Sequence, residues 1–232
     1  MKKRLSKVLA QAGIASRRSC ERLIIEGAVS VNGSVVLLPG TLVNPDRDRI
    51  EVSGKPVKDE EEKVYYLLNK PKGYLCTHKR PHPQAKIVFD LFPECQERLF
   101  TAGRLDKMTE GLIVVTNDGA LAHKMIHPSS GVQKEYLAKV REFISHSHLE
   151  TLSRGIEIGG ERILPSKVSK VRKNTLKIVV MEGKKHEVRL MLQQAELELI
   201  ELKRIRIGNL HLGKLGTGDF KRMSKRELEG VF

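Results

Sequence analysis

An acidic block, Asp59-Glu60-Glu61-Glu62, divides the chain into two parts with different hydrophobic patterns. Short helical stripes and a hairpin pattern precede it, and a strand-like apolar run at residues 64–68 follows it. A run of like charges repels itself and stays solvated, which is typical of a linker. The chain has 232 residues, enough for two hydrophobic cores. We therefore predict two domains, residues 1–60 and 61–232.

The first part has the pattern of a helix pair followed by a hairpin. Apolar residues recur at helical spacing in residues 5–12, and Gly13 can end that helix. A second stripe, in residues 20–24, follows Ser16, which is a suitable N-cap. Asn32-Gly33 then separates two apolar runs and is the favoured hairpin turn. The sequence predicts a small unit that is complete in itself.

Basic side chains gather on these two helices. Arg17, Arg18 and Arg22 fall off the apolar stripe of the second helix and are expected to face outward, together with Lys7 and Arg4 nearby in sequence. The whole chain is basic, with 42 Lys and Arg against 28 Asp and Glu and a net charge of +14, which indicates a polyanionic partner. A solvated helix face is the alternative. We favour a nucleic-acid surface because the cluster lacks balancing acids.

The second part mixes strand and helix patterns. Strand-like runs occur at residues 112–115, 176–181 and 197–202. Two helical stripes are expected, one with Leu121, Met125 and Ile126 inward and one with Val188, Leu192 and Ala195 on one side. This mixed order favours an α+β fold over a βαβ repeat.

The sequence lacks the motifs of several kinds of binding site and of exported or membrane-spanning proteins. His123 and His127 lie at i, i+4 but lack the Glu of HExxH and a third ligand, so we expect no metal. Neither GxxxxGK[ST] nor GxGxxG occurs, so we expect no nucleotide cofactor. Three cysteines without a CxxC pair indicate a reducing compartment. No apolar run approaches the roughly 20 residues of a membrane span, and charged residues interrupt any signal-peptide core, so we expect a cytoplasmic protein.

One loop combines acids, bases and glycines directly before a strong strand: Gly103-Arg104-Leu105-Asp106-Lys107-Met108-Thr109-Glu110-Gly111. Taken alone, its aspartate is an ordinary turn residue. Three further segments occur with it, and they are Asn69-Lys70-Pro71-Lys72-Gly73, Lys134-Glu135-Tyr136 and Glu182-Gly183-Lys184-Lys185-His186-Glu187-Val188-Arg189-Leu190-Met191. Together these segments resemble the RNA pseudouridine synthases of the RsuA type. The amino-terminal stretch is similar to an S4 RNA-binding domain.

The resemblance covers nearly the whole chain and implies its fold. We expect an α+β protein with a small S4 domain, made of a helix pair and a hairpin, before a synthase domain. That domain would have a mixed, largely antiparallel sheet with a cleft. The chain departs from the family in the last motif, where Gln-Val-Arg-Arg-Met is usual and this sequence has Glu187 and Leu190.

By this resemblance Asp106 is the catalytic aspartate. Uridine isomerisation breaks the bond from N1 of uracil to C1′ of ribose and re-forms it from C5, so no group is lost and no cofactor is needed. The carboxylate either attacks C1′ or takes a proton from C2′ to give a glycal, and the sequence leaves both routes open. Either role needs an ionised carboxylate where water is excluded, and Arg189 is the family's cationic partner. A surface salt bridge is the alternative role of Arg189.

The resemblance implies three more site residues. Tyr136 would lie against the uracil ring, although taken alone it is a strand aromatic that fills a core. Arg104 would fill the space left when the target base turns out of its stack. Lys70, with Lys72, would form a basic turn at the edge of the cleft, where phosphate contact and simple solubility are both reasonable.

The implied function is conversion of a specific uridine in ribosomal RNA to pseudouridine by a monomeric enzyme, and we favour large-subunit RNA. One alternative is a non-catalytic S4-containing RNA-binding or ribosome-assembly factor, against which the intact Asp106, Tyr136 and Arg189 argue. Another is a nucleoside hydrolase that uses the same aspartate and releases free base.

Overall fold

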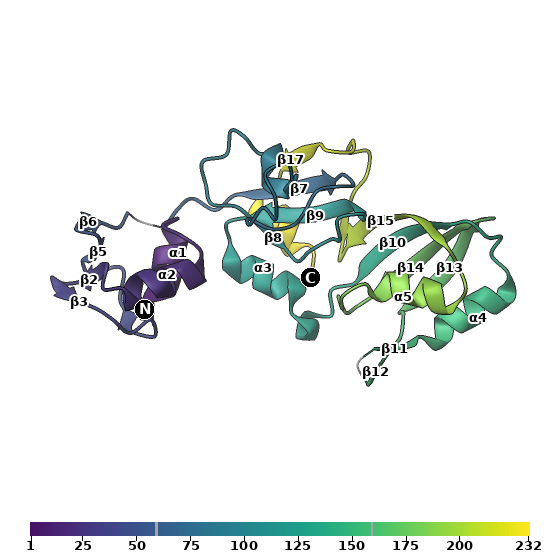
Figure 1. The fold of residues 1–232 in the computed structure, drawn as a ribbon, viewed down its shortest axis with the longest axis horizontal. Helices are drawn as coiled ribbons and strands as arrows, with labels where there is room; N and C mark the ends of the chain where they lie inside the picture. The colour runs from purple at the N-terminus through teal and green to yellow at the C-terminus, as the bar shows by residue number, and fades with distance from the viewer. Residues whose placement is uncertain (59, 159) are drawn as a thin grey trace. The chain divides into compact units, whose positions relative to one another are not determined.

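The computed structural model describes residues 1–58, 60–158 and 160–232, and the chain forms two compact units (Figure 1). The first unit contains Met1–Lys63 and Cys95–Arg98, and the second contains Val64–Glu94 and Leu99–Phe232. Asp59, in the predicted linker, lies outside the described residues. Glu60, in the same block, accepts a hydrogen bond from Gln11 Nε2 at 2.8 Å. That part of the acidic block therefore belongs to the first unit.

The first unit has the predicted helix pair and hairpin. Helix α1 (Leu5–Gln11) is followed by α2 (Arg17–Ile25), and Ser16 Oγ caps α2 by accepting from the backbone N–H of Ser19. The strands form two small antiparallel sheets, β1 (Lys3–Arg4) with β4 (Leu42–Val43), and β3 (Ser34–Val35), β2 (Val29–Val31), β5 (Ile50–Val52) and β6 (Lys55–Pro56) in that order. The core contains the apolar stripes of both helices.

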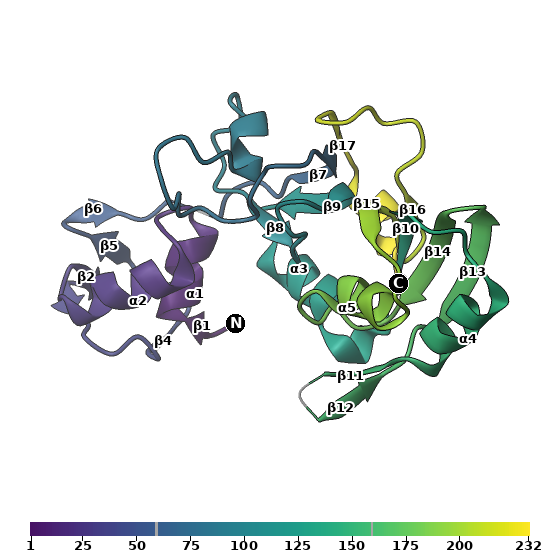
Figure 2. The ribbon, with the colours of Figure 1, turned by 45° about the vertical axis from the view of Figure 1, so that its right-hand side comes forward.

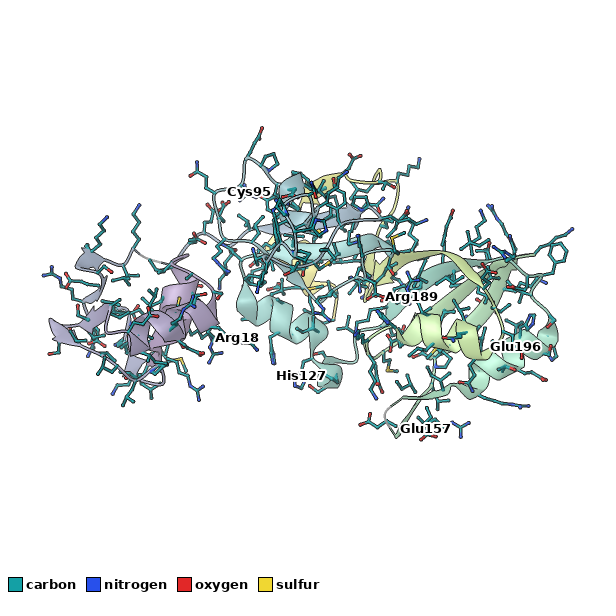
Figure 3. All side chains as sticks on the ribbon, in the orientation of Figure 1. Arg18, Cys95, His127, Glu157, Arg189 and Glu196 are labelled. Carbon is teal, nitrogen blue, oxygen red and sulfur yellow. The ribbon has the colours of Figure 1, made fainter. Side chains whose placement is uncertain are left out.

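The basic cluster is exposed, as expected, and consists of Arg4 in β1, Lys7 in α1, and Arg17, Arg18 and Arg22 in α2 (Arg18 is labelled in Figure 3). The expectation that this cluster lacks balancing acids is wrong in part. Arg17 Nε lies 3.6 Å from Glu21 Oε1, one helical turn along, so one of the five has an acidic neighbour.

The second unit is built on a nine-stranded sheet. Its main order is β13 (Lys167–Arg172), β14 (Thr175–Val180), β10 (Lys134–Val140), β15 (Leu199–Ile207), β9 (Glu110–Thr116), β7 (Tyr65–Lys70) and β17 (Phe220–Arg222), with β16 (Leu210–His211) on β15 and β8 (Phe100–Ala102) on β9. The β9–β15 pair is parallel and the others are antiparallel. The predicted α+β class and the mixed, largely antiparallel sheet are confirmed.

The central strand β9 is apolar on both faces, which explains its continuous hydrophobic run. Its start approaches β15 closely at Gly111, where φ is 106° and an added Cβ would lie 2.2 Å from the backbone oxygen of Arg204. A glycine is required there by both its conformation and the lack of space. The loop of residues 103–111 therefore ends against Arg204.

Three helices lie below the sheet as it is seen in Figures 1 and 2, and they are α3 (Gly119–Ile126), α4 (His146–Arg154) and α5 (Glu187–Gln194). The hairpin of β11 (Ile156–Ile158) and β12 (Glu161–Ile163) lies on the same side. The unit also has a short α6 (Lys225–Glu229) and 3-10 turns at Val88–Leu91 and Pro128–Ser130. Among the described residues, no helix has the length and apolar character to cross a bilayer.

The helix patterns of the second part are confirmed with one correction. Val188, Leu192 and Ala195 are buried, as expected for one face of α5. Met125 of α3 is buried too, whereas Ile126 is 48% exposed and was wrongly predicted to face inward. Ile126 is the last residue of α3, and it lines the rim of a cavity instead of the core.

Candidate active site

A cavity of about 430 Å³ lies within the second unit, in the size range of small-molecule pockets. It brings together three of the four sequence motifs with the end of α3 and the strand β15. The lining residues include Arg104, Asp106 and Thr109 of the loop of residues 103–111, Met125 and Ile126 of α3, Lys134 and Tyr136 of β10, residues 183–189, and Leu202, Arg204 and Ile207 of β15.

A buried lysine anchors the loop of residues 103–111 through hydrogen bonds to its backbone. Lys70 is 0% exposed, and its Nζ lies within 3.4 Å of four backbone oxygens, those of Pro71, Asp106, Lys107 and Thr109. Burial lowers the pKa of Lys70 to about 8, because the charged form is less well solvated. The prediction that Lys70 contacts RNA phosphate is wrong, since the side chain is enclosed. It positions the loop that carries Asp106.

Asp106 lies between two nitrogen-bearing side chains. Arg189 Nε is 3.5 Å from Asp106 Oδ2, and His186 Nε2 is 3.4 Å from Asp106 Oδ1. Arg189 does not grip both carboxylate oxygens, because its Nη2 donates to Thr109 Oγ1 at 3.1 Å (Arg189 is labelled on α5 in Figure 3). The arginine thus links the aspartate to the loop that carries it, from the first turns of α5.

His186 was not singled out from the sequence as a site residue. It precedes α5 with a φ of 61°, in the left-handed region that a non-glycine residue seldom adopts. Backbone strain of this kind concentrates at functional sites. The available signal was its place in the last motif, three residues before Arg189, together with its titratable ring.

Tyr136 lies in the wall of the cavity and is 8% exposed. Its hydroxyl oxygen accepts a hydrogen bond from Nη1 of Arg204 at 3.4 Å, and Arg204 Nε donates to the backbone oxygen of Leu112 at 2.8 Å. Arg204 itself is buried, and the sequence analysis missed it because it lies in an otherwise ordinary strand pattern. The register that sets Arg204 opposite Tyr136 explains why the two meet.

Glu187, one of the two departures from the family motif, also lines the cavity and is 3% exposed. Burial raises its pKa to about 7, and the backbone N–H of Lys184 and the charge of Lys134 act in the opposite direction. Lys134 in turn has a lowered pKa, because of burial and the nearby charge of Arg204. At neutral pH this carboxyl therefore exists partly in its uncharged form, in which it can donate a hydrogen bond as a glutamine can.

Arg104 lines the cavity with an exposed side chain, two residues before Asp106. Lys72, the other lysine of the basic turn, pairs with Glu110 at 3.7 Å. Among the described residues, no three His, Cys, Asp or Glu side chains gather as metal ligands would. The cavity thus combines a carboxylate between an arginine and a histidine, a phenol, and an arginine at its rim.

Comparison with known proteins adds to this geometry. The family model for RNA pseudouridylate synthase matches residues 64–194, and the model for the S4 domain matches residues 3–48. The chain belongs to the RNA pseudouridine synthase family. It is accordingly an isomerase that acts on RNA, and the expected resemblance is confirmed.

Relatives match over almost the full length of this synthase. An uncharacterized RNA pseudouridine synthase of Aquifex aeolicus is 42% identical over 236 residues, covering 100% of this chain and 94% of the relative. The ribosomal large subunit pseudouridine synthase B of Bacillus subtilis is 38% identical, covering 97% and 94%. A putative chloroplastic ribosomal large subunit synthase of Arabidopsis thaliana is 44% identical, and the match spans 98% of this chain but only 60% of that relative.

A solved structure supports the fold. The crystal structure of a pseudouridylate synthase superposes with a TM-score of 0.71 at 26% identity, covering 99% of both chains.

Proposed function

We propose that this synthase converts a specific uridine of large-subunit ribosomal RNA to pseudouridine, with Asp106 as its catalytic carboxylate. The observation that carries the proposal is the position of Asp106, on the cavity wall with Arg189 and His186 at its two oxygens. The choice of ribosomal RNA is supported by the relatives from Bacillus subtilis and Arabidopsis thaliana, whose names specify the large ribosomal subunit.

Asp106 acts at the ribose and Tyr136 at the base. The carboxylate either attacks C1′ or removes the C2′ proton, and both routes need its ionised form. The guanidinium of Arg189 lies beside one of its oxygens. The Tyr136 ring lies against uracil, and its hydroxyl is available for proton transfer at C5. Arg104, exposed at the rim, occupies the gap in the RNA after the target nucleotide is flipped into the cavity.

The two domains divide the work. Residues 1–60 form the S4 domain, whose exposed basic cluster binds RNA phosphates, and residues 61–232 form the catalytic domain. The enzyme acts as a monomer. We place the enzyme in the cytoplasm with its RNA substrate, and the isomerisation needs no cofactor.

Carbodiimide mapping of pseudouridine in ribosomal RNA tests the proposal. RNA is compared from cells that have the gene, cells that lack it, and deleted cells that express the Asp106→Asn variant. We expect one large-subunit site to be lost on deletion and restored only by the wild-type gene. Restoration by Asp106→Asn would instead indicate a non-catalytic assembly role, and free uracil released from RNA by the purified enzyme would indicate a hydrolase.

A further inference from the structure

Arg204 is a buried cation with no acidic partner among the described residues. It is 4% exposed, and Nε and Nη1 donate to Leu112 and Tyr136 as described above. Its Nη2 is shielded from water and, within the part of the chain that the structure describes, has no hydrogen-bond partner. Burying a charge is strongly unfavourable unless it is paired, and an unmatched donor adds to that cost. Arg204 therefore lines the cavity while carrying a buried donor that no described group satisfies.

Three other cations in or near the cavity, none of them with an exposed side chain, do have partners. Lys70 is surrounded by four backbone oxygens, and Lys134 Nζ donates to the backbone oxygens of Met181 and Glu182. Arg206, two residues along the same strand, donates to Glu135 at 3.0 Å. Arg204 differs from these cations because it lines the cavity and its donor Nη2 has no acceptor among the described residues.

The backbone around Arg204 is fixed by the sheet. It pairs with Gly111 of β9 on one side and with Tyr136 of β10 on the other. Because Nη1 donates to the Tyr136 oxygen, the phenolic hydrogen is not used in that bond and remains free for another acceptor. Arg204 and Tyr136 thus supply two donors to one wall of the cavity.

We propose that Arg204 is a catalytic residue whose Nη2 donates to a carbonyl oxygen of the flipped uracil and stabilises the negative charge that the ring carries during the reaction. This role rests on the proposed isomerisation at Asp106. When the N1–C1′ bond breaks, both of its electrons stay on the ring, and the charge is shared among N1 and the two carbonyl oxygens. The ring then bonds to C1′ through C5, loses the C5 proton and gains a proton at N1. Arg204 keeps its proton throughout.

The charge is the same whether Asp106 attacks C1′ or forms a glycal, because the uracil leaves as an anion in both routes. A fixed guanidinium in a site shielded from water is well suited to stabilise it, since no solvent has to reorganise as the charge develops. Uracil has a carbonyl oxygen on each side of its N3–H, and either oxygen can accept the hydrogen bond from Arg204.

The test compares two RNA probes, transcribed large-subunit fragments that span the mapped target and carry either uridine or 5-fluorouridine. Fluorine withdraws electrons and stabilises the detached ring, so the reaction should depend less on Arg204. We measure the single-turnover rate at which the original target nucleoside is lost, at saturating enzyme. For Arg204→Gln we expect a loss of about 100-fold or more with uridine RNA but less than about 10-fold with 5-fluorouridine RNA. RNA affinity should change by less than about threefold, since the donor acts at the reacting base.

Arg206→Gln is the matched control, because it removes a guanidinium from the same strand whose partners are protein groups. Any loss it causes should be equal with the two probes. Arg204→Lys keeps the charge and should recover part of the rate, and it replaces Arg204→Gln in the comparison if that variant melts well below the wild type.

Equal losses with the two probes, or a wild-type rate in Arg204→Gln, would overturn the role of Arg204. A wild-type enzyme that forms no pseudouridine in the uridine probe would instead contradict the proposed ribosomal function. The two failures are therefore distinguishable.

Discussion

In the first unit the basic side chains of α2 stand in solvent, whereas in the synthase unit Lys70, Glu187 and Arg204 are enclosed. Exposed charges are screened by salt, and RNA affinity depends on how many of them contact phosphates, so each contributes modestly to binding. Enclosed charges act through a specific geometry, and removing one leaves its partners unmatched. We therefore expect variants of the synthase unit to change the chemical step or stability, and variants of the first unit to change RNA affinity alone.

The largest effect is expected for Asp106→Asn, which tests whether a variant of the synthase unit changes the chemical step. It removes the carboxylate that either route requires while leaving a side chain of similar shape. Single-turnover pseudouridine formation should fall by at least about 10³-fold, with RNA affinity unchanged within a few fold. Asp219→Asn, the same charge change on an exposed residue outside the cavity, is the control. Activity above a few per cent of the wild type would remove Asp106 from its role.

Arg189 should have the next largest effect. Arg189→Ala removes the contact to Asp106 and the hydrogen bond to Thr109 together, so we expect a rate loss of about 10² to 10³-fold. Arg189→Lys should recover only part of it, because one ammonium group cannot reproduce two separate guanidinium contacts. The measurement is the single-turnover rate at saturating RNA. A near wild-type rate in Arg189→Ala would mean that His186 alone suffices to hold the aspartate.

Local patterns in the sequence predicted much of the fold and the exposed charges. Helix α1 and strand β9 follow from spacing within a few residues, and Arg18 faces solvent because it lies off its helix's stripe. The enclosed charges could not be predicted in this way. Lys70 was misassigned because its partners at residues 106–109 lie 36 to 39 positions away.

Arg204 was missed for the same reason. Its contacts with Leu112 and Tyr136 span 92 and 68 positions and depend on the strand order of the sheet. The motifs identified Asp106, Tyr136 and Arg189 only through the family resemblance, and the cavity brings those three together. Burial of a charge is thus the feature that a sequence pattern conveys least.

A smaller effect, on stability, is expected at Glu187. Its pKa is about 7 in the folded protein against 4.5 for an ordinary glutamate, so the folded state holds a proton that the unfolded state releases between these values. The stabilisation is fully present below pH 4.5 and is lost as pH rises through 7. The free energy of unfolding should therefore fall by up to about 3 kcal/mol more across this range in the wild type than in Glu187→Gln.

Denaturant unfolding at a series of pH values measures this difference, and Glu157→Gln, which changes a glutamate with an exposed side chain in the same unit, is the control (Glu157 is labelled in Figure 3). Parallel pH curves for the wild type and Glu187→Gln would show that Glu187 is charged in the folded protein, which would weaken the contrast between the two units.

The smallest effect on chemistry is expected in the first unit, where Arg17, Arg18 and Arg22 are replaced together by alanine. Each phosphate contact releases about one counterion, so the slope of log K against log salt should flatten by about 2 to 3, the lower figure applying if Glu21 already neutralises Arg17. Affinity for the ribosomal RNA probe is measured over a salt series, with Arg47→Ala, an exposed arginine outside the helix pair, as the control.

Because the side chains of Arg17, Arg18 and Arg22 lie outside the cavity, the single-turnover rate of bound RNA should stay within about twofold. An unchanged slope with unchanged affinity would mean that the cluster is only solvated, whereas a large loss of rate at saturation would show that this surface contributes to chemistry and that the two units are not separable in function.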